Sequence, residues 1–363
     1  ANNNTAIGYS ALTANTTGIR NLAVGYQAGL ALTTGGYNTF IGERAGKSQT
    51  TAAENIALGS SALSTNITGT GLVAIGKNAL DVNTASNNTA VGWKALTANT
   101  TGSGNVAVGS LVLDANTTGD SNTAIGHESL SGNTTGQRNV SLGLGSMYTN
   151  STGNYNVALG YASLTANTTA SNNTAVGYAS LTANTTGTSN TAVGRLSLDA
   201  NTTGDENVAI GNQSLTANTT AHDNTAIGAN SLTANTTGAS NVAIGQQSLN
   251  SNTTASNNTA VGKSALSVNT TGTRNTAVGM SVMTATTTGV DNTAIGGIDA
   301  AANATLGTNT TGTNNVAVGG GALYANTTAS NNTGVGYRAL KANTTGAYNT
   351  ALGASSLSSE TQG

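Results

Sequence analysis

The sequence predicts an all-β fold, a β-solenoid (β-roll) of about 21 coils with 17 residues in each rung. Three observations predict it: one short phrase recurs at a fixed period, one glycine position never changes, and proline is absent. A fixed period of this size is typical of solenoids, in which each repeat stacks on the next. Proline has no backbone N–H, so its absence is expected where nearly every N–H donates to a neighbouring coil.

The repeat has the consensus N-T-A-V-G-x-x-S-L-T-A-N-T-T-G-x-x, whose positions we number 1 to 17. Units recur from Asn4 to Asn349, and we expect residues 1–363 to form a single continuous array. The rung at 72–87 is one residue short, and the unit 292–314 carries a six-residue insertion. Low charge and few bulky residues are often signs of disorder, but a disordered chain has no reason to keep such a period.

The segment at positions 2 to 5 predicts a short strand, because small and β-branched residues alternate there. Position 5 is Gly in all 21 units, which indicates a positive φ or a close approach of another backbone. Position 3 is Ala in most units and lies on the strand face opposite Val or Ile at position 4. Which face points to the chain's own core is left open. We favour the Ala face as a contact between chains, which enlarging Ala192, Ala209 and Ala226 to Leu would disturb.

The second half of the unit predicts a core residue followed by a turn. Position 9 is usually Leu and is expected in the core, and the Asn-Thr-Thr-Gly that comes after it has the composition of a turn. Position 15 is Gly in 15 units and Ala in six, and each of those six units ends in Asn, Asp or Glu. Because Asn and Asp tolerate the left-handed region, we expect one left-handed residue, supplied at either position 15 or position 17.

Composition and motifs indicate little chemistry. The chain has 11 Lys and Arg, dispersed among 13 Asp and Glu, so no nucleic-acid-binding patch is expected. No apolar run is long enough to insert in a membrane. His127 and His222 lie far apart without metal-ligand partners. A pair of carboxylic acids can catalyse glycoside hydrolysis, but acidic residues at turn positions are more often solvated surface groups. Two such pairs repeat in the sequence: Asp114 with Asp120, and Asp199 with Asp205. We expect no enzyme, no cofactor and no metal site.

Position 6 varies freely and carries aromatic residues in several units. Amphipathic aromatic side chains on an exposed ridge suit contact with sugars or proteins, although freely varying positions are also what an unconstrained surface shows. The candidate exposed surface contacts are Tyr9, Tyr26, Trp93, Tyr161, Tyr178 and Tyr337. Asn-Thr-Thr also matches the N-glycosylation acceptor pattern, but we interpret these asparagines as ladder and turn residues.

The phrase Asn-[Thr/Val]-Ala-[Ile/Val]-Gly-x-x-[Ala/Ser]-Leu, present at 88–96 and 224–232, resembles the head repeats of trimeric autotransporter adhesins. It is also similar to Asn/Thr/Gly-rich repeats of bacteriophage tail fibres, and the longer turn of this unit resembles the phage form more. The resemblance implies a parallel homotrimer of left-handed β-rolls, located extracellularly on a virion tail fibre or a bacterial cell surface. It also implies a structural function: a rigid rod that projects or presents a host- or surface-binding end, with a host glycan or protein as partner.

The number of chains in the assembly can be considered from the apolar content of one coil. One coil offers only about two large apolar side chains, each worth roughly 2 kcal/mol when buried, so we expect neighbouring chains to bury more surface. The alternative is a monomeric β-solenoid that binds a surface, including ice, through its stacked threonines.

Overall fold

The structure is a computed structural model that describes residues 2–359. These residues form two compact units, divided after Thr186. Each unit is a parallel β-solenoid whose coils repeat about every 17 residues, and residues 2–359 contain no helix. The predicted all-β solenoid is therefore confirmed.

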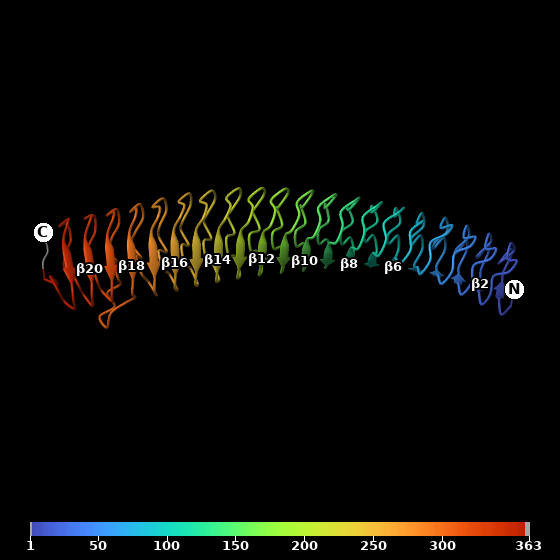
Figure 1. The fold of residues 1–363 in the computed structure, drawn as a ribbon, viewed down its shortest axis with the longest axis horizontal. Coiled ribbons are helices and arrows are strands. Elements are labelled where there is room, and N and C mark those ends of the chain that lie inside the picture. The colour runs from blue at the N-terminus through green and yellow to red at the C-terminus, as the bar shows by residue number, and fades with distance from the viewer. Residues whose placement is uncertain (1, 360–363) are drawn as a thin grey trace. The chain divides into compact units, whose positions relative to one another are not determined.

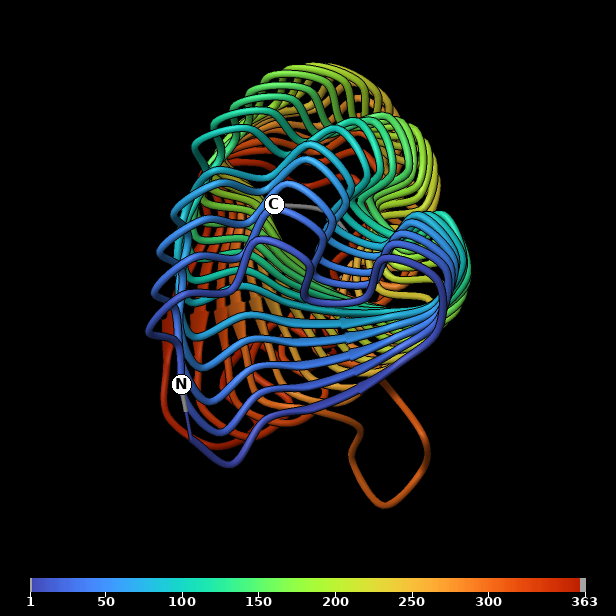
Figure 2. The ribbon, with the colours of Figure 1, turned by 90° about the vertical axis from the view of Figure 1, so that its right-hand side faces the viewer.

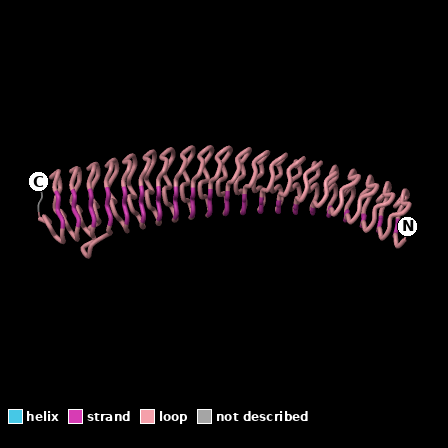
Figure 3. The backbone as a smooth tube through the Cα atoms, in the orientation of Figure 1, coloured by secondary structure: helices cyan, strands magenta, loops and turns pink. Residues whose placement is uncertain are grey.

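Every coil contributes one three-residue strand, drawn in magenta in Figure 3. The strands of the first unit are β1 (Thr5–Ile7), β2 (Leu22–Val24), β3 (Thr39–Ile41), β4 (Ile56–Leu58), β5 (Val73–Ile75), β6 (Thr89–Val91), β7 (Val106–Val108), β8 (Thr123–Ile125), β9 (Val140–Leu142), β10 (Val157–Leu159) and β11 (Thr174–Val176). The strands of the second unit are β12 (Thr191–Val193), β13 (Val208–Ile210), β14 (Thr225–Ile227), β15 (Val242–Ile244), β16 (Thr259–Val261), β17 (Thr276–Val278), β18 (Thr293–Ile295), β19 (Val316–Val318), β20 (Thr333–Val335) and β21 (Thr350–Leu352).

Consecutive strands within a unit pair in parallel, with equivalent positions of the repeat opposite each other (Figure 1). Ala192, for example, pairs with Ala209. The short coil keeps this register, because Val73 still pairs with Thr89. The six-residue insertion also keeps it, because Thr293 pairs with Val316. In Figure 2 the insertion (orange) projects from coils that otherwise repeat one outline.

Backbone hydrogen bonds between coils continue outside the strands, and they point to both neighbours. The N–H of Leu12 donates to the carbonyl of Ala28 in the next coil at 3.0 Å. The N–H of Gly25 donates back to Ile7 in the preceding coil at 2.8 Å. Such donors recur both in the strands and in the turns that connect them. A proline at any of these places would remove an N–H donor and break the contact between coils.

The core is lined by the small face of each strand. Ala192, Ala209 and Ala226 are 0% exposed, as are the position-9 leucines Leu198 and Leu215. The expectation that the Ala face contacts neighbouring chains is therefore wrong, whereas the expectation of Leu in the core is confirmed. Each coil is thin, so its interior accepts one large side chain from position 9 and only a small one opposite it.

Phe40 shows how tightly this interior is matched. It occupies position 3, where most other coils have Ala, and it is fully buried. The two nearby position-9 residues are Gly29 and Gly46 instead of Leu. A Cβ atom added to Gly29 would lie 2.8 Å from the Phe40 ring, and one added to Gly46 would lie 2.6 Å from it. The one large ring therefore fills the space of two missing leucines.

The invariant glycine of position 5 has both predicted reasons. Gly211 has a φ of +134°, and a Cβ built there would lie 2.6 Å from the carbonyl oxygen of Gly228 in the next coil. An L-residue would be strained and would also collide with backbone that cannot move away.

The left-handed residue of the turn is placed differently from our expectation. Position 17 is left-handed whether position 15 is Gly or Ala: Ser189 has φ 58° after Gly187, and Asn172 has φ 63° after Ala170. Position 15 is small for another reason, because a Cβ on Gly153 would lie 2.2 Å from the carbonyl oxygen of Ala170 in the next coil. The proposed exchange of roles between these positions is wrong. Ala never occupies position 15 in two successive coils, which fits this close approach.

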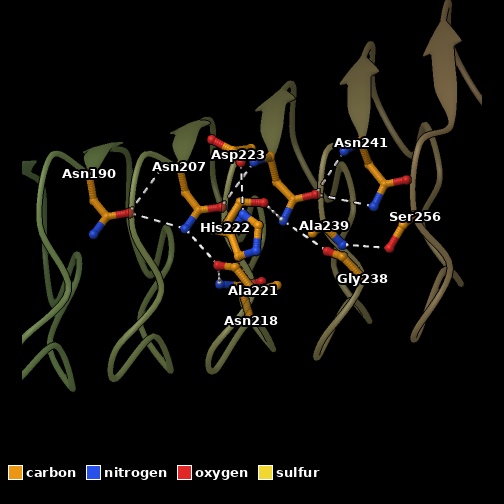
Figure 4. Close-up of polar contacts among 11 residues, drawn as sticks. Asn190, Asn207, Asn218, Ala221, His222, Asp223, Gly238, Ala239, Asn241 and Ser256 are labelled. Atoms are coloured by element: carbon orange, nitrogen blue, oxygen red, sulfur yellow. Dashed lines mark hydrogen bonds and ion pairs between the residues drawn. The ribbon is translucent and has the colours of Figure 1, made fainter.

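Two buried asparagine ladders connect the coils, and Figure 4 shows part of the position-1 ladder, from Asn190 to Asn241. In the position-1 ladder, the Nδ2 of Asn207 donates to Asn190 Oδ1 at 3.1 Å and to the carbonyl of Ala221 at 2.9 Å. In the position-12 ladder, the Nδ2 of Asn218 donates to Asn201 Oδ1 at 2.9 Å and to the same Ala221 carbonyl at 3.0 Å. All four asparagines are 0% exposed. The ladder interpretation is confirmed, and burial leaves no room for a glycan on position 12.

Candidate functional site

The exposed surface is organised in columns, one for each outward position of the repeat. Charged residues of the repeat occupy positions 6, 7, 10, 16 and 17, with two further acidic residues at 299 and 360. Positions 2 and 4, the outward face of the strands, carry no charge in any unit. Among the described residues there is no cleft and no group of three or more potential metal ligands. A functional site in this protein is therefore a surface.

The first candidate surface is the outward strand face, which we define as positions 2 and 4. Position 4 is Val, Ile or Leu in all 21 units, although these side chains are partly exposed. In the first unit Ile75 is 38% exposed and Ile125 is 39% exposed, and in the second Ile244 is 38% exposed. The coil turns its Ala inward and leaves the larger residues of the strand partly in solvent, so the face combines an apolar column at position 4 with threonine or apolar residues at position 2.

The second candidate surface is the position-6 ridge, where all six aromatic residues named from the sequence lie. Their exposed fractions run from 44% for Tyr26 and Tyr337 to 71% for Tyr9. Tyr9 stacks on Tyr26 with ring centroids 5.5 Å apart, and Tyr161 stacks on Tyr178 at the same distance. Stacking covers one face of each ring, so a ligand could reach only the edges, the hydroxyls and the outer faces of each pair. Their role as receptor contacts stays a prediction.

The remaining two position-6 aromatics, Trp93 and Tyr337, are not part of these tyrosine stacks. Each contacts the cationic residue next to it in the chain. The Lys94 ammonium lies 4.8 Å from the Trp93 ring centroid, and the Arg338 guanidinium lies 4.9 Å from that of Tyr337. Such cation–π contacts at exposed sites are worth about 0.5–1 kcal/mol. The structure therefore brings together two tyrosine pairs and leaves Trp93 and Tyr337 as separate sites.

A third surface, the position-17 column, was not singled out from the sequence. Arg20 Nη1 donates to the Tyr37 hydroxyl at 2.6 Å, and its guanidinium lies 5.2 Å from the ring centroid. Arg138 and Tyr155 repeat the same hydrogen bond, with the guanidinium 5.3 Å from the ring. The sequence signal is an arginine with a tyrosine 17 residues later, at a position where the backbone aligns the two side chains.

The acidic residues and histidines named from the sequence bond mainly to neighbouring side chains. Asp114 accepts a hydrogen bond from Ser131 Oγ at 2.7 Å, and Asp120 accepts one from Ser103 Oγ at 3.1 Å in the opposite direction along the stack. Burial raises the pKa of Asp199 above its ordinary value. The Asp205 carboxylate accepts a hydrogen bond from Thr188 Oγ1 at 2.9 Å.

Each histidine instead has an acidic neighbour in the chain. His222 Nδ1 lies 2.7 Å from Asp223 Oδ2 (Figure 4), and His127 Nδ1 lies 3.8 Å from Glu128 Oε2. Both pairs are adjacent residues on the exposed surface, and no third ligand completes a metal site among the described residues.

The insertion is held by one buried carboxylate. Asp299 accepts hydrogen bonds from the backbone N–H of Ala301 at 2.8 Å and of Asn303 at 2.9 Å, and from Arg338 Nε at 2.5 Å. Burial raises the pKa of Asp299, but the hydrogen bonds from Arg338 and Asn303 outweigh it and hold the pKa well below its ordinary value. Sequence reasoning placed the insertion but did not find this attachment, because Arg338 is 39 residues away.

No protein-family model matches the chain, and no curated protein matches it. Within residues 2–359 there is no helix with the length and apolar character needed to cross a membrane.

Proposed function

We propose that this protein is a structural segment of a fibre or adhesin, a stiff solenoid that presents a host- or surface-binding end and exposes ridges for receptor contacts. In this proposal three chains pack as a parallel homotrimer of left-handed β-rolls. The location is extracellular, on a virion tail fibre or a bacterial cell surface. The observation that carries the proposal is the outward strand face, which has no charge in any unit and presents a partly exposed Val, Ile or Leu at position 4 of every coil.

The size of this face is in the range at which exposed patches are often functional. The first unit has eleven strands of three residues, and at ~4.8 Å between strands and ~3.3 Å per residue they make a face of about 500 Å². Apolar patches on typical monomers reach only about 300–600 Å² and are often functional at that size. A standard interface buries about 800 Å² per partner, and the ten strands of the second unit form a separate face of similar size.

The partner that fits this face best is another copy of the same chain. Position 4 never becomes polar, whereas position 6, two residues later, changes freely, so the constraint on the outward face does not extend to the neighbouring exposed ridge. A second copy has the same spacing between coils, and its side chains can therefore interlock at every coil. The absence of charge at positions 2 and 4 removes like-charge repulsion between identical faces.

Native mass spectrometry of the unmodified protein at micromolar concentration tests the proposal, with a three-chain mass as the expected result. Replacing Ile210, Ile227 and Ile244 together with Glu should dissociate the assembly, because it places three charges on the outward face. The matched control puts Glu at position 7 of the same three coils, at residues 213, 230 and 247, and should leave the trimer intact. A stable monomer for the unmodified chain, or a trimer that survives the isoleucine changes, would contradict the proposal.

The ice-binding alternative has less support. The Thr236 hydroxyl donates to the carbonyl of Thr253 at 3.1 Å, and this bond recurs from coil to coil in the position-13 column. These hydroxyls are thus engaged with backbone rather than directed to an external lattice. Thermal hysteresis of a monomeric sample would revive that alternative.

A further inference from the structure

We infer that the two Arg–Tyr pairs of the position-17 column, Arg20 with Tyr37 and Arg138 with Tyr155, bind carboxylated sugars of an acidic polysaccharide. The inference rests on the proposed surface-contact function and names the ligand class for it. It begins from the repetition: two coils far apart in the first unit carry the same pair with the same hydrogen bond and nearly the same ring distance.

The arginines are held in place but remain able to bind an anion. The tyrosine hydroxyl accepts from one Nη1 of each guanidinium, and a guanidinium has five N–H donors. Neither guanidinium forms an ion pair with a carboxylate of the described residues. Both arginines are exposed. A planar guanidinium fixed in this way presents its remaining N–H groups in the geometry that a carboxylate accepts from two donors.

The tyrosines supply the second half of a sugar site. Tyr37 is 51% exposed and Tyr155 is 52% exposed, and an amphipathic ring beside a cation can pack against the apolar face of a sugar. A uronic acid joins both features, because its carboxylate and its ring face belong to one residue of the polymer. This combination favours a carboxylated sugar over a simple anion, which would use the arginine alone.

The same column contains an internal comparison. Arg274 also lies at position 17, but it donates to Asp291 through Nε at 2.7 Å and through Nη2 at 2.8 Å. The Arg274 hydrogen bonds lower the pKa of Asp291, so the carboxylate is ionised and neutralises the guanidinium. Arg274 should therefore not bind the sugar, although it has the same backbone position and similar exposure.

The two Arg–Tyr pairs have different neighbours in the next coil of the column. Glu54 lies one coil beyond Tyr37, whereas Asn172 lies one coil beyond Tyr155. A carboxylate at this place repels an acidic ligand. Glu54→Asn should thus strengthen the Arg20 site. Asn is tolerated there, because Glu54 has a φ of 60° and Asn adopts this region readily. The Arg138 site has its own acidic neighbour in the preceding coil, Asp120, whose backbone carbonyl accepts from the Arg138 N–H at 3.0 Å.

The spacing of the pairs predicts dependence on polymer length. Arg20 and Arg138 are seven coils apart, which is about 34 Å at ~4.8 Å per coil. A polymer that reaches both sites gains from effective concentration. We expect a long oligogalacturonate to bind at least tenfold more tightly than digalacturonate.

Isothermal titration of the assembled protein with oligogalacturonate tests the inference, and its methyl ester serves as the uncharged ligand. Arg20→Gln and Arg138→Gln should each remove one of two digalacturonate sites, and the double variant should abolish binding. Arg274→Gln is the matched control and should leave affinity unchanged, while Glu54→Asn should raise it. Thermal unfolding of each variant verifies the fold.

Unchanged affinity in the double variant, equal binding of the methyl ester, or no binding of oligogalacturonate at millimolar uronate would overturn the inference. Equal binding of a polyphosphate of the same length would overturn the assignment to sugars. Native mass spectrometry of the same samples separates this failure from that of the proposed function, because loss of sugar binding with an intact trimer contradicts only the inference.

Discussion

Thr286 interrupts the position-12 asparagine ladder, and Thr286→Asn should stabilise the second unit. In intact coils, each ladder asparagine donates to the preceding one, as Asn235 does to Asn218 at 3.0 Å. At residue 286 a buried threonine takes this place, and its hydroxyl has no partner. The Oδ1 of Asn269 in the preceding coil is also buried without a partner. In the next coil, Asn309 keeps its bond to the carbonyl of Gly312 at 3.1 Å.

The magnitude depends on the groups that the substitution would pair. An asparagine at 286 can donate to Asn269 Oδ1 and accept from Asn309 Nδ2, which restores two ladder bonds and removes an unpaired hydroxyl. A typical hydrogen bond contributes about 0.5–1.5 kcal/mol net, and an unpaired buried group costs about 1–3 kcal/mol. We therefore expect a gain of about 1–3 kcal/mol in the free energy of local opening. Because 1.4 kcal/mol is a factor of ten, amide exchange should slow about 5- to 150-fold.

Hydrogen exchange measured by mass spectrometry over residues 262–316 is the suitable assay, because coils of a solenoid can open locally. Two variants separate the contributions. Thr286→Val removes the unpaired hydroxyl without restoring the ladder and should recover only part of the gain. Asn235→Thr introduces the same interruption into an intact stretch and should speed local exchange by a similar factor. If Thr286→Asn exchanges as fast as the unmodified protein, or if Asn235→Thr has no effect, the ladder does not stabilise the stack as argued.

Three further predictions concern packing and charge. Phe40→Ala should cost about 3–5 kcal/mol of unfolding free energy, and adding Gly29→Leu and Gly46→Leu should recover most of that loss in denaturant titration. If the added leucines do not restore stability, the ring and the leucines do not occupy the same space. Gly211→Ala should lower the denaturation midpoint clearly, because the added methyl meets the carbonyl of Gly228, and an unchanged midpoint would contradict the close approach. Asp299 has a lowered pKa in the folded state, so its contribution to stability is present above its unfolded pKa of about 3.8 and is lost as the pH falls below that value. Asp299→Asn should therefore lower the melting temperature at pH 7, and the melting temperatures of the variant and the unmodified protein should approach each other in acid. A difference in melting temperature that stays constant with pH would contradict this argument.

Much of the fold was predictable because its information is local and periodic. The constant glycine of position 5 required either a positive φ or a close approach, and Gly211 shows both. Leucine at position 9 and asparagine at positions 1 and 12 recur in every part of the array, and their burial in ladders and core is the consequence of that recurrence. The exposed position-6 column was also visible, since free variation at a fixed place in the repeat is typical of surface.

The sequence by itself thus determined the period, the one-strand coil and the all-β class, because each depends on spacing along the chain. Only the tertiary structure decided which face of each strand points into the core and which points to solvent. Size normally predicts burial, so Ile210 would be placed inside and Ala209 outside, yet Ala209 is 0% exposed and Ile210 is 37% exposed. The reason is closure: once Leu198 and Leu215 enter a narrow coil from the opposite side, the remaining width accepts a methyl group and excludes a branched side chain. The Arg–Tyr pairs depend on the same closure, because only stacked coils bring residues 17 apart into contact.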